Sequence, residues 1–451
     1  MGLIDFFRPA PTIPEIQDEG VVAKKYKHWR WRIFSGMYVG YVFYYFTRKS
    51  YTCIMPFLMK DLGFTKSELG ILASIMALTY GASKFLSGIL ADKSNPRIFM
   101  SIGLILTGVF NILFGYSSSI LWFAIFWGCT GWFQGWGWPP CAKLLTHWYS
   151  QKERGTWWGM WNSSHNVGGA IIPIVVGICA QFFGWRFGMF IPGIMSIVIG
   201  IFLLFCLRDT PNSLGLPSIE KFRNDYPAGK TQEENISVKD LLFKYVLNNS
   251  YIWLLAVAYF FVYFVRGAVN DWSALFLMET RGYSLVTATA SITWFEIGGL
   301  IGSLVAGWAS DVIFQGRRGP IMVLFSIGVV VALVGLWMMP AGYLLVDYAL
   351  IFAIGFLIFG PQMLIGIAAT ELSHKKAAGS ATGFTGWIAY IGMAMAGYPL
   401  GKIMEVSGWQ GCFVTLIGCS ILCIFLLLPI WSIKTNPKYL TPSDEEKQVT
   451  S

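Results

Sequence analysis

The sequence predicts an all-α membrane protein with twelve transmembrane helices in two pseudo-symmetric six-helix bundles. Three observations predict it: apolar stretches long enough to cross a bilayer, an uneven distribution of Lys and Arg between the loops, and an internal repeat. Of the 451 residues, 55% are hydrophobic and 13% are charged, whereas soluble domains carry about 25% charged residues. This composition excludes an ordinary soluble globular protein.

The apolar stretches are the first observation. A run of about 18 or more apolar residues indicates a membrane-spanning helix, and these stretches lack the polar face of a soluble amphipathic helix. We expect spans, with boundaries accurate to a few residues, at 33–57, 68–91, 98–116, 120–142, 158–180, 187–207, 250–273, 287–311, 320–340, 346–369, 378–401 and 411–432.

The basic residues are the second observation. Of 33 Lys and Arg, 24 fall in the two tails, the even-numbered loops and the long central loop, and five fall in the odd-numbered loops. Because basic residues concentrate on the cytoplasmic side, we expect both termini and the central loop there. The net charge of +9 therefore reflects topology, and we expect no nucleic-acid binding. The polar start of the chain does not resemble a cleavable signal peptide.

The longest polar insert divides the spans into six and six. We expect a cytoplasmic tail at 1–32, a six-helix bundle at 33–207, a cytoplasmic linker at 208–249, a second bundle at 250–432 and a cytoplasmic tail at 433–451.

An internal repeat supports this division. Residues 41–48 and 259–266 share five of eight positions at an offset of 218, and the GxxxD stretches 88–92 and 307–311 correspond at an offset of 219. Parallel repeats of this kind are typical of transporters built from two halves. Asp92 and Asp311, each followed by basic residues, could form charge latches, or could simply end the helices and fix the topology.

Arg48 and Arg266 lie at matching depths in the first and seventh spans. An arginine within the membrane is energetically costly, so it faces a cavity or a partner. A guanidinium group stays charged and presents a planar set of donors that suits phosphate oxygens. One arginine from each half predicts a phosphate, phosphonate or dicarboxylate ligand. The alternative is that each arginine forms a structural ion pair with an intramembrane acid.

The intramembrane acids are too few for that alternative alone. Only Asp271 and Glu296 lie well inside predicted spans, whereas Lys49 and Lys84 add two cations to the two arginines. The excess positive charge favours an anion site. Lys49 lies about 100° around the helix from Arg48, so we expect it to pair with Asp271.

Polar side chains that share helix faces with these cations are candidate cavity residues. Asn162, His165 and Asn166 have the spacing of one helix face, and His165 could take up a proton when phosphate arrives. A lone histidine or tyrosine can also be structural or interfacial, and glutamines can join helices. The remaining candidates are Tyr41, Tyr44, Tyr45, Tyr80, Tyr263, Tyr390, Gln134 and Gln362.

The motifs resemble those of a known family. Residues 40–49, 131–140, 150–155, 161–169 and 208–211 resemble the bacterial organophosphate:phosphate antiporters of the major facilitator superfamily.

The resemblance implies a protein of the bacterial inner membrane. It also implies that Arg48 and Arg266 bind phosphate, with Lys84 and His165 lining the same cavity. Lys49, Asp271 and Glu296 would form charge pairs that rearrange during transport.

Residues 144–148 and 359–366 look closer to the hexose-phosphate branch of this family, including its sensors, than to the glycerol-3-phosphate branch. We therefore expect exchange of external hexose 6-phosphate, first of all glucose 6-phosphate, for internal inorganic phosphate by rocking of the two halves. The alternatives are a membrane sensor with a signalling kinase partner, a glycerol-3-phosphate antiporter and a proton-coupled importer of another organic anion.

The sequence favours no enzyme. It shows no catalytic motif, no metal-ligand cluster and no cofactor motif, and its eight cysteines lie in or near apolar spans without a CxxC spacing. We expect no catalytic residue, no metal and no cofactor, and a monomer whose partners are the sugar phosphate, inorganic phosphate and the lipid bilayer.

Overall fold

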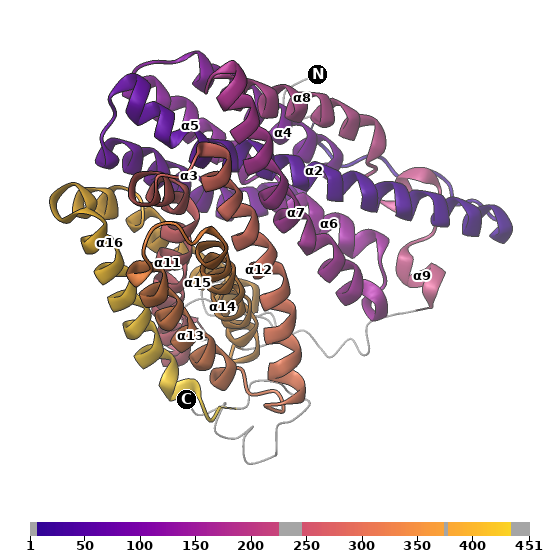
Figure 1. The fold of residues 1–451 in the computed structure, drawn as a ribbon. Coiled ribbons are helices and arrows are strands. Elements are labelled where there is room, and N and C mark those ends of the chain that lie inside the picture. Colours follow the sequence, from indigo (N-terminus) through magenta and orange to yellow (C-terminus); the bar gives the residue numbers. More distant parts are fainter. Residues whose placement is uncertain (1–6, 225–245, 374–377, 434–451) are drawn as a thin grey trace. The chain divides into compact units, whose positions relative to one another are not determined.

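The computed structural model describes residues 7–224, 246–373 and 378–433, and within these ranges the regular elements are helices (Figure 1). Eight helices of the described part are long and apolar enough to cross a membrane. The chain is a multi-pass, all-α membrane protein, as the composition predicts. This is the expected outcome in lipid, where a helix satisfies its own backbone hydrogen bonds.

The helices pack into two compact units. The first contains Met1–Tyr51 and Ala82–Glu234, and the second contains Thr52–Gly81 and Asn235–Ser451. Two helices, α2 (Glu19–Leu62) and α3 (Lys66–Lys93), contribute to both units. The segment Thr52–Gly81 thus packs with the C-terminal half, although it precedes the predicted linker in sequence.

The rest of the first unit is built around α4, which packs against α8. The two helices approach closely at Gly108 and Gly193, where a Cβ on Gly108 would lie 2.5 Å from the Gly193 carbonyl oxygen. Small residues at such crossings let membrane helices pack tightly. The elements of this part are α4 (Pro96–Tyr116), α5 (Ile120–Gln134), α6 (Trp138–Trp148), α7 (Gln151–Phe183), α8 (Phe187–Cys206), η1 (Pro211–Leu214) and α9 (Ile219–Arg223).

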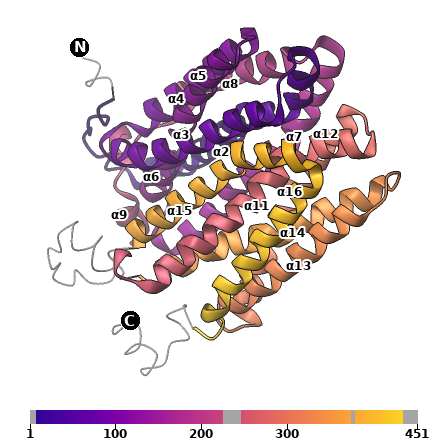
Figure 2. The same cartoon turned by 90° about the vertical axis from the view of Figure 1, so that its left-hand side faces the viewer.

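The second unit is built around two helix pairs, α12 with α14 and α11 with α15. Figure 2 shows α11, α15 and α16 of this unit together, and α11 also packs against α16. The elements are α11 (Ser250–Arg281), α12 (Leu285–Val312), α13 (Gly319–Met338), α14 (Leu344–Glu371), α15 (Ala378–Met395), α16 (Tyr398–Leu427) and η4 (Leu428–Ile430).

Some helix boundaries differ from the predicted spans. The helix α2 begins at Glu19, inside the stretch predicted as a tail. The fourth predicted span is divided into α5 and α6, because Pro139 lacks a backbone donor and is tolerated best in the first turn of a new helix. The helix α16 runs through the predicted last loop and bends at Gly408, which has a φ of 60°. Hydropathy identifies apolar stretches, but it does not show where a helix begins, breaks or bends.

Candidate functional site

Each unit contains one of the two candidate intramembrane arginines, Arg48 in the first and Arg266 in the second. In the first unit, the guanidinium carbon of Arg48 lies 5.5 Å from the ring centroid of Tyr45. In the second unit, that of Arg266 lies 5.6 Å from the ring centroid of Tyr263. Each tyrosine precedes its arginine by three residues, so the helix spacing brings both onto one face. The sequence repeat is therefore also a repeat of side-chain geometry.

The aromatic face beneath Arg48 continues to α7. Tyr45 packs against His165, with 5.5 Å between ring centroids, and Tyr41 packs against Trp161 at 4.8 Å. His165 Nδ1 contacts the backbone carbonyl oxygen of Asn162. Arg48, Tyr45 and His165 are thus neighbours within the first unit, and a shared phosphate-binding role for Arg48 and His165 stays a prediction.

Two other predicted residues of the first unit hold helices together. Tyr44 is buried, and its hydroxyl donates to the Met100 carbonyl oxygen at 2.8 Å. Gln134 is buried at the end of α5, and its side-chain nitrogen donates to the Tyr44 carbonyl oxygen and to Thr47 Oγ1, both at 2.8 Å. These contacts agree with the alternative that Gln134 joins helices. A contact with sugar hydroxyls stays a prediction.

The other candidates of this unit have varied surroundings. Lys84 is partly buried, and its Nζ lies 5.1 Å from the ring centroid of Trp138. Lys49 and Asn166 are buried, whereas Asn162 is exposed. Asp92 is on α3, but its side chain lies outside the described part of the structure.

Tyrosines and one phenylalanine surround Arg266 in the second unit. Tyr390 of α15 packs against Tyr263 at 5.3 Å and against Tyr80 of α3 at 5.0 Å between ring centroids. The guanidinium carbon of Arg266 lies 4.5 Å from the ring centroid of Phe359. The predicted tyrosines are thus neighbours, and Phe359 is a contact that the sequence analysis missed. An aromatic ring in an apolar span carries no signal that distinguishes it from ordinary packing.

The polar side chains near this cluster are buried to different degrees. Glu296 on α12 is completely buried. Asp271 accepts from Thr52 Oγ1 at 3.3 Å and from the Asn270 side-chain nitrogen at 2.5 Å. Its expected pairing with Lys49 stays a prediction. Gln362 lies one turn from Phe359, and among the described atoms its Oε1 is buried without a hydrogen-bond partner.

Arg318 organises the charges at the end of α12. It contacts Asp311 at 2.5 Å and Glu371 at 2.9 Å, so it joins the end of α12 to the end of α14. Burial lowers the pKa of Arg318, but its hydrogen bonds and charge interactions with Glu371 and Asp311 outweigh burial and raise it. Arg318 is thus a basic partner of Asp311 of the kind that the sequence predicts. Glu371 is a third residue of this charge cluster, which the sequence repeat did not indicate.

A second set of polar contacts attaches Thr52–Gly81 to the rest of its unit. Lys66 Nζ lies 2.6 Å from Glu279 Oε2, and Ser67 Oγ donates to Glu405 Oε1 at 2.7 Å. Ser74 Oγ donates to the Ala394 carbonyl oxygen at 2.5 Å. Lys66, Glu279, Ser67 and Glu405 lie in or next to the odd-numbered loops, where polar and charged residues are common and give no signal of a contact between helices.

The comparisons with known proteins agree with this architecture. The Major Facilitator Superfamily model matches residues 37–397. A probable hexose phosphate transport protein of Chlamydia pneumoniae is 56% identical over 439 residues, covering 95% of this chain and 96% of the relative. The membrane sensor protein UhpC of Escherichia coli (strain K12) is 47% identical over 435 residues, covering 96% of this chain and 99% of that protein.

A solved structure shares the fold at low sequence identity. It is a bacterial homologue of the human lysosomal transporter Spinster in an inward-facing, unoccupied conformation. The TM-score is 0.72 at 14% identity, and the match covers 92% of this chain and 99% of that chain.

Proposed function

We propose a function from one premise: the chain belongs to the Major Facilitator Superfamily. Its relatives include a probable hexose phosphate transport protein, and the antiporter family suggested by the sequence motifs is consistent with them. We infer that this chain exchanges external hexose 6-phosphate, first of all glucose 6-phosphate, for internal inorganic phosphate. A transport function without an enzymatic step fits the family.

The observation that carries this proposal is the matched arginine–tyrosine arrangement in the two units. The distances of 5.5 Å for Arg48 over Tyr45 and 5.6 Å for Arg266 over Tyr263 are nearly equal. A guanidinium group can pack against a ring and also donate a planar pair of hydrogen bonds to phosphate oxygens. In the proposed mechanism the two arginines bind one phosphate group, and Lys84 and His165 contribute to the same cavity.

The proposed exchange follows from the charge of the site. Two arginines that approach each other without an anion repel, and this repulsion raises the free energy of the empty, closed carrier. A bound phosphate dianion offsets the repulsion and lowers the barrier to reorientation of the two halves. Because only the loaded carrier reorients readily, uptake of a sugar phosphate requires release of phosphate on the other side.

Counterflow in proteoliposomes tests this function. Vesicles loaded with inorganic phosphate should accumulate labelled glucose 6-phosphate, and vesicles without internal phosphate should not. Labelled glycerol 3-phosphate and phosphate, assayed in parallel, decide between the hexose-phosphate and glycerol-3-phosphate alternatives. Uptake driven by a pH gradient alone would contradict the proposed exchange and favour proton-coupled import.

The variant Arg266→Lys tests the role of the arginine itself. Lysine keeps the charge but lacks the paired donors, so exchange should be lost. The matched control is Arg317→Lys, because Arg317 contacts the Phe314 carbonyl oxygen at the end of α12 and belongs to no proposed substrate contact. Unchanged exchange with Arg266→Lys would contradict the proposed phosphate site.

A second candidate function is favoured by the 47% identity to a membrane sensor protein. In that case the chain would bind hexose phosphate with negligible flux and would signal through a kinase. Saturable binding of glucose 6-phosphate to the purified chain, combined with absent counterflow and a co-purifying kinase, would favour the sensor.

A further inference from the structure

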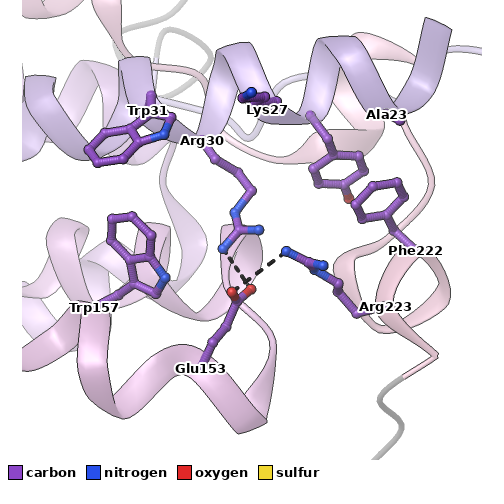
Figure 3. Close-up of a pocket in the computed structure, with 9 residues that line it drawn as sticks. Ala23, Lys27, Arg30, Trp31, Glu153, Trp157, Phe222 and Arg223 are labelled. Atoms are coloured by element: carbon purple, nitrogen blue, oxygen red, sulfur yellow. Dashed lines mark ion pairs between the residues drawn. The ribbon is translucent and has the colours of Figure 1, made fainter. Parts of the chain in front are cut away.

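A pocket in the first unit shares no lining residue with the candidate site. Its volume is about 310 Å³, and three segments line it: the first turns of α2, the start of α7 and the end of α9 (Figure 3). The segments of α2 and α7 directly precede predicted spans, and α9 lies within the predicted linker. The lining residues are Ala23, Tyr26, Lys27, Arg30, Trp31, Glu153, Trp157, Phe222 and Arg223.

The pocket carries more positive than negative charge. Three cations, Lys27, Arg30 and Arg223, line it together with one carboxylate, Glu153. Arg30 Nη2 lies 2.6 Å from Glu153 Oε1, whereas Arg223 Nη2 lies 3.8 Å from Glu153 Oε2, which is beyond hydrogen-bond distance. Figure 3 shows both guanidinium groups turned toward this carboxylate. Glu153 therefore neutralises one cation and leaves the pocket positive.

The donors of Arg30 are incompletely used. Arg30 is 9% exposed, and among the described atoms its Nε is buried without a hydrogen-bond partner. A buried donor without an acceptor is unfavourable. Arg30 is nevertheless held firmly, because its guanidinium carbon lies 4.6 Å from the ring centroid of Tyr149. Arg30 is therefore a fixed cation, and Glu153 does not satisfy all of its hydrogen-bond donors.

Aromatic side chains form the walls of the pocket. Tyr26 and Phe222 are stacked at 4.1 Å between ring centroids, and Trp31 meets Trp157 edge to face at 5.4 Å. The Tyr26 hydroxyl donates to the Pro217 carbonyl oxygen at 2.5 Å, which attaches the start of the linker to α2. Rigid aromatic walls with a few convergent charges are typical of small-molecule sites, and the volume is at the small end of their range.

We propose that this pocket is a second anion site, which binds a phosphate monoester of sugar-phosphate size or the equivalent headgroup of a phosphatidate lipid. The phosphate oxygens accept from Lys27 and Arg223 and draw Arg223 away from its loose contact with Glu153. The carbon skeleton of the ligand packs against Trp31 and Trp157. Occupation of the pocket ties α9, and with it the start of the linker, to α2 and α7.

Equilibrium binding to the full chain in phosphatidylcholine nanodiscs tests this site. Labelled glucose 6-phosphate should occupy one more equivalent on the wild type than on Lys27→Gln/Arg223→Gln. Because each substitution replaces a charged donor by a neutral one, and charge-assisted hydrogen bonds are the stronger kind, the double variant should bind at this site more than about tenfold more weakly. Lys27 is exposed and Arg223 is about half exposed, so neither substitution leaves a cavity in the core. The single variant Lys27→Gln serves if the double variant unfolds.

The matched control is Lys24→Gln/Lys25→Gln, which removes two exposed cations of α2 that do not line the pocket. It should keep the wild-type number of bound equivalents. The count of equivalents does not depend on transport, so a failure of the proposed exchange leaves this test intact.

A second arm of the experiment identifies the source of the phosphate. Phosphatidate in the nanodiscs should displace the labelled ligand from the wild type and remain bound to it during purification if the natural ligand is a lipid. If the natural ligand is soluble, phosphatidate has no effect and unlabelled glucose 6-phosphate competes. Equal binding of glucose 6-phosphate and phosphatidate by the wild type, the pocket variant and the control overturns the proposal.

Discussion

The guanidinium carbon of Arg266 lies 4.5 Å from the ring centroid of Phe359, so a ring from α14 supports an arginine from α11. Tyr263 holds the same arginine from its own helix at 5.6 Å. Arg266 is therefore held between two rings, and it is only 9% exposed. Its orientation depends on the contact between α11 and α14 as well as on its own helix.

The first prediction concerns this ring. Phe359→Leu should raise the sugar-phosphate concentration for half-maximal exchange by about 2- to 30-fold, because a cation–π contact contributes about 0.5–2 kcal/mol. Phe359→Tyr keeps the ring and should stay close to the wild type. The measurement is the concentration dependence of counterflow. An unchanged half-maximal concentration with Phe359→Leu would show that the ring does not position Arg266 for substrate.

The second prediction concerns Lys66 and Glu279, whose side-chain atoms meet at 2.6 Å. In the proposed exchange cycle, the contacts of Thr52–Gly81 with α11 and α16 close the external side. A short bis-methanethiosulfonate crosslinker, which forms disulfides with the cysteines of Lys66→Cys/Glu279→Cys, should therefore stop exchange, and reduction of these disulfides should restore it.

The control for this experiment is each single cysteine variant treated with the same reagent. It should retain exchange, because the introduced cysteine then has no introduced partner on the other helix. Exchange that continues in the crosslinked double variant would contradict the rocking mechanism.

The third prediction concerns the crossing of α12 and α14 at Gly302. A Cβ at this position would lie 1.8 Å from the Phe356 carbonyl oxygen, so Gly302→Ala must push the two helices apart. We expect a lower melting temperature in detergent, since overpacking costs about 1–3 kcal/mol or more. Gly366→Ala on α14 is the control, because a Cβ there meets nothing within 4 Å. Equal melting temperatures for the two variants would contradict the observed helix contact.

The fourth prediction concerns Asp347, which is completely buried at the start of α14. Asp347 Oδ1 lies 3.6 Å from Arg281 Nε, and Asp347 Oδ2 accepts from the Tyr283 hydroxyl at 2.7 Å. Asp347→Asn should destabilise the protein by about 3–5 kcal/mol, because it leaves the charge of Arg281 without its carboxylate. Thermal inactivation of the purified chain measures this loss.

Tyr283→Phe should be milder than Asp347→Asn, since it removes one hydrogen bond and no charge. Burial and the hydrogen bond to Asp347 raise the pKa of Tyr283 to about 12. The phenol is thus protonated in the folded protein at neutral pH, and its contribution should be lost only as the pH rises from about 10, the ordinary tyrosine pKa, toward that value. A larger effect of Tyr283→Phe than of Asp347→Asn would show that the ion pair is not the main contribution.

Several features of the site follow from sequence periodicity. The three-residue spacing of Tyr45 with Arg48 and of Tyr263 with Arg266 places each pair on one helix face, and the structure confirms both pairs. The spacing also places Tyr44 near Arg48, but the Tyr44 hydroxyl bonds to α4 instead. Periodicity assigns a residue to a face of its helix, and it does not identify the helix that packs there.

The sequence by itself determined the all-α membrane class, the family and the position of one arginine in each half. These properties are local: a helix in lipid must satisfy its own backbone, so apolar runs and intramembrane charges can be read directly from the chain. Only the tertiary structure decided that Phe359 supports Arg266, that Arg318 joins Asp311 to Glu371, and that α2, α7 and α9 enclose an aromatic, positively charged pocket. Those contacts depend on how helices distant in sequence cross and rotate against one another, which no spacing along a single helix specifies.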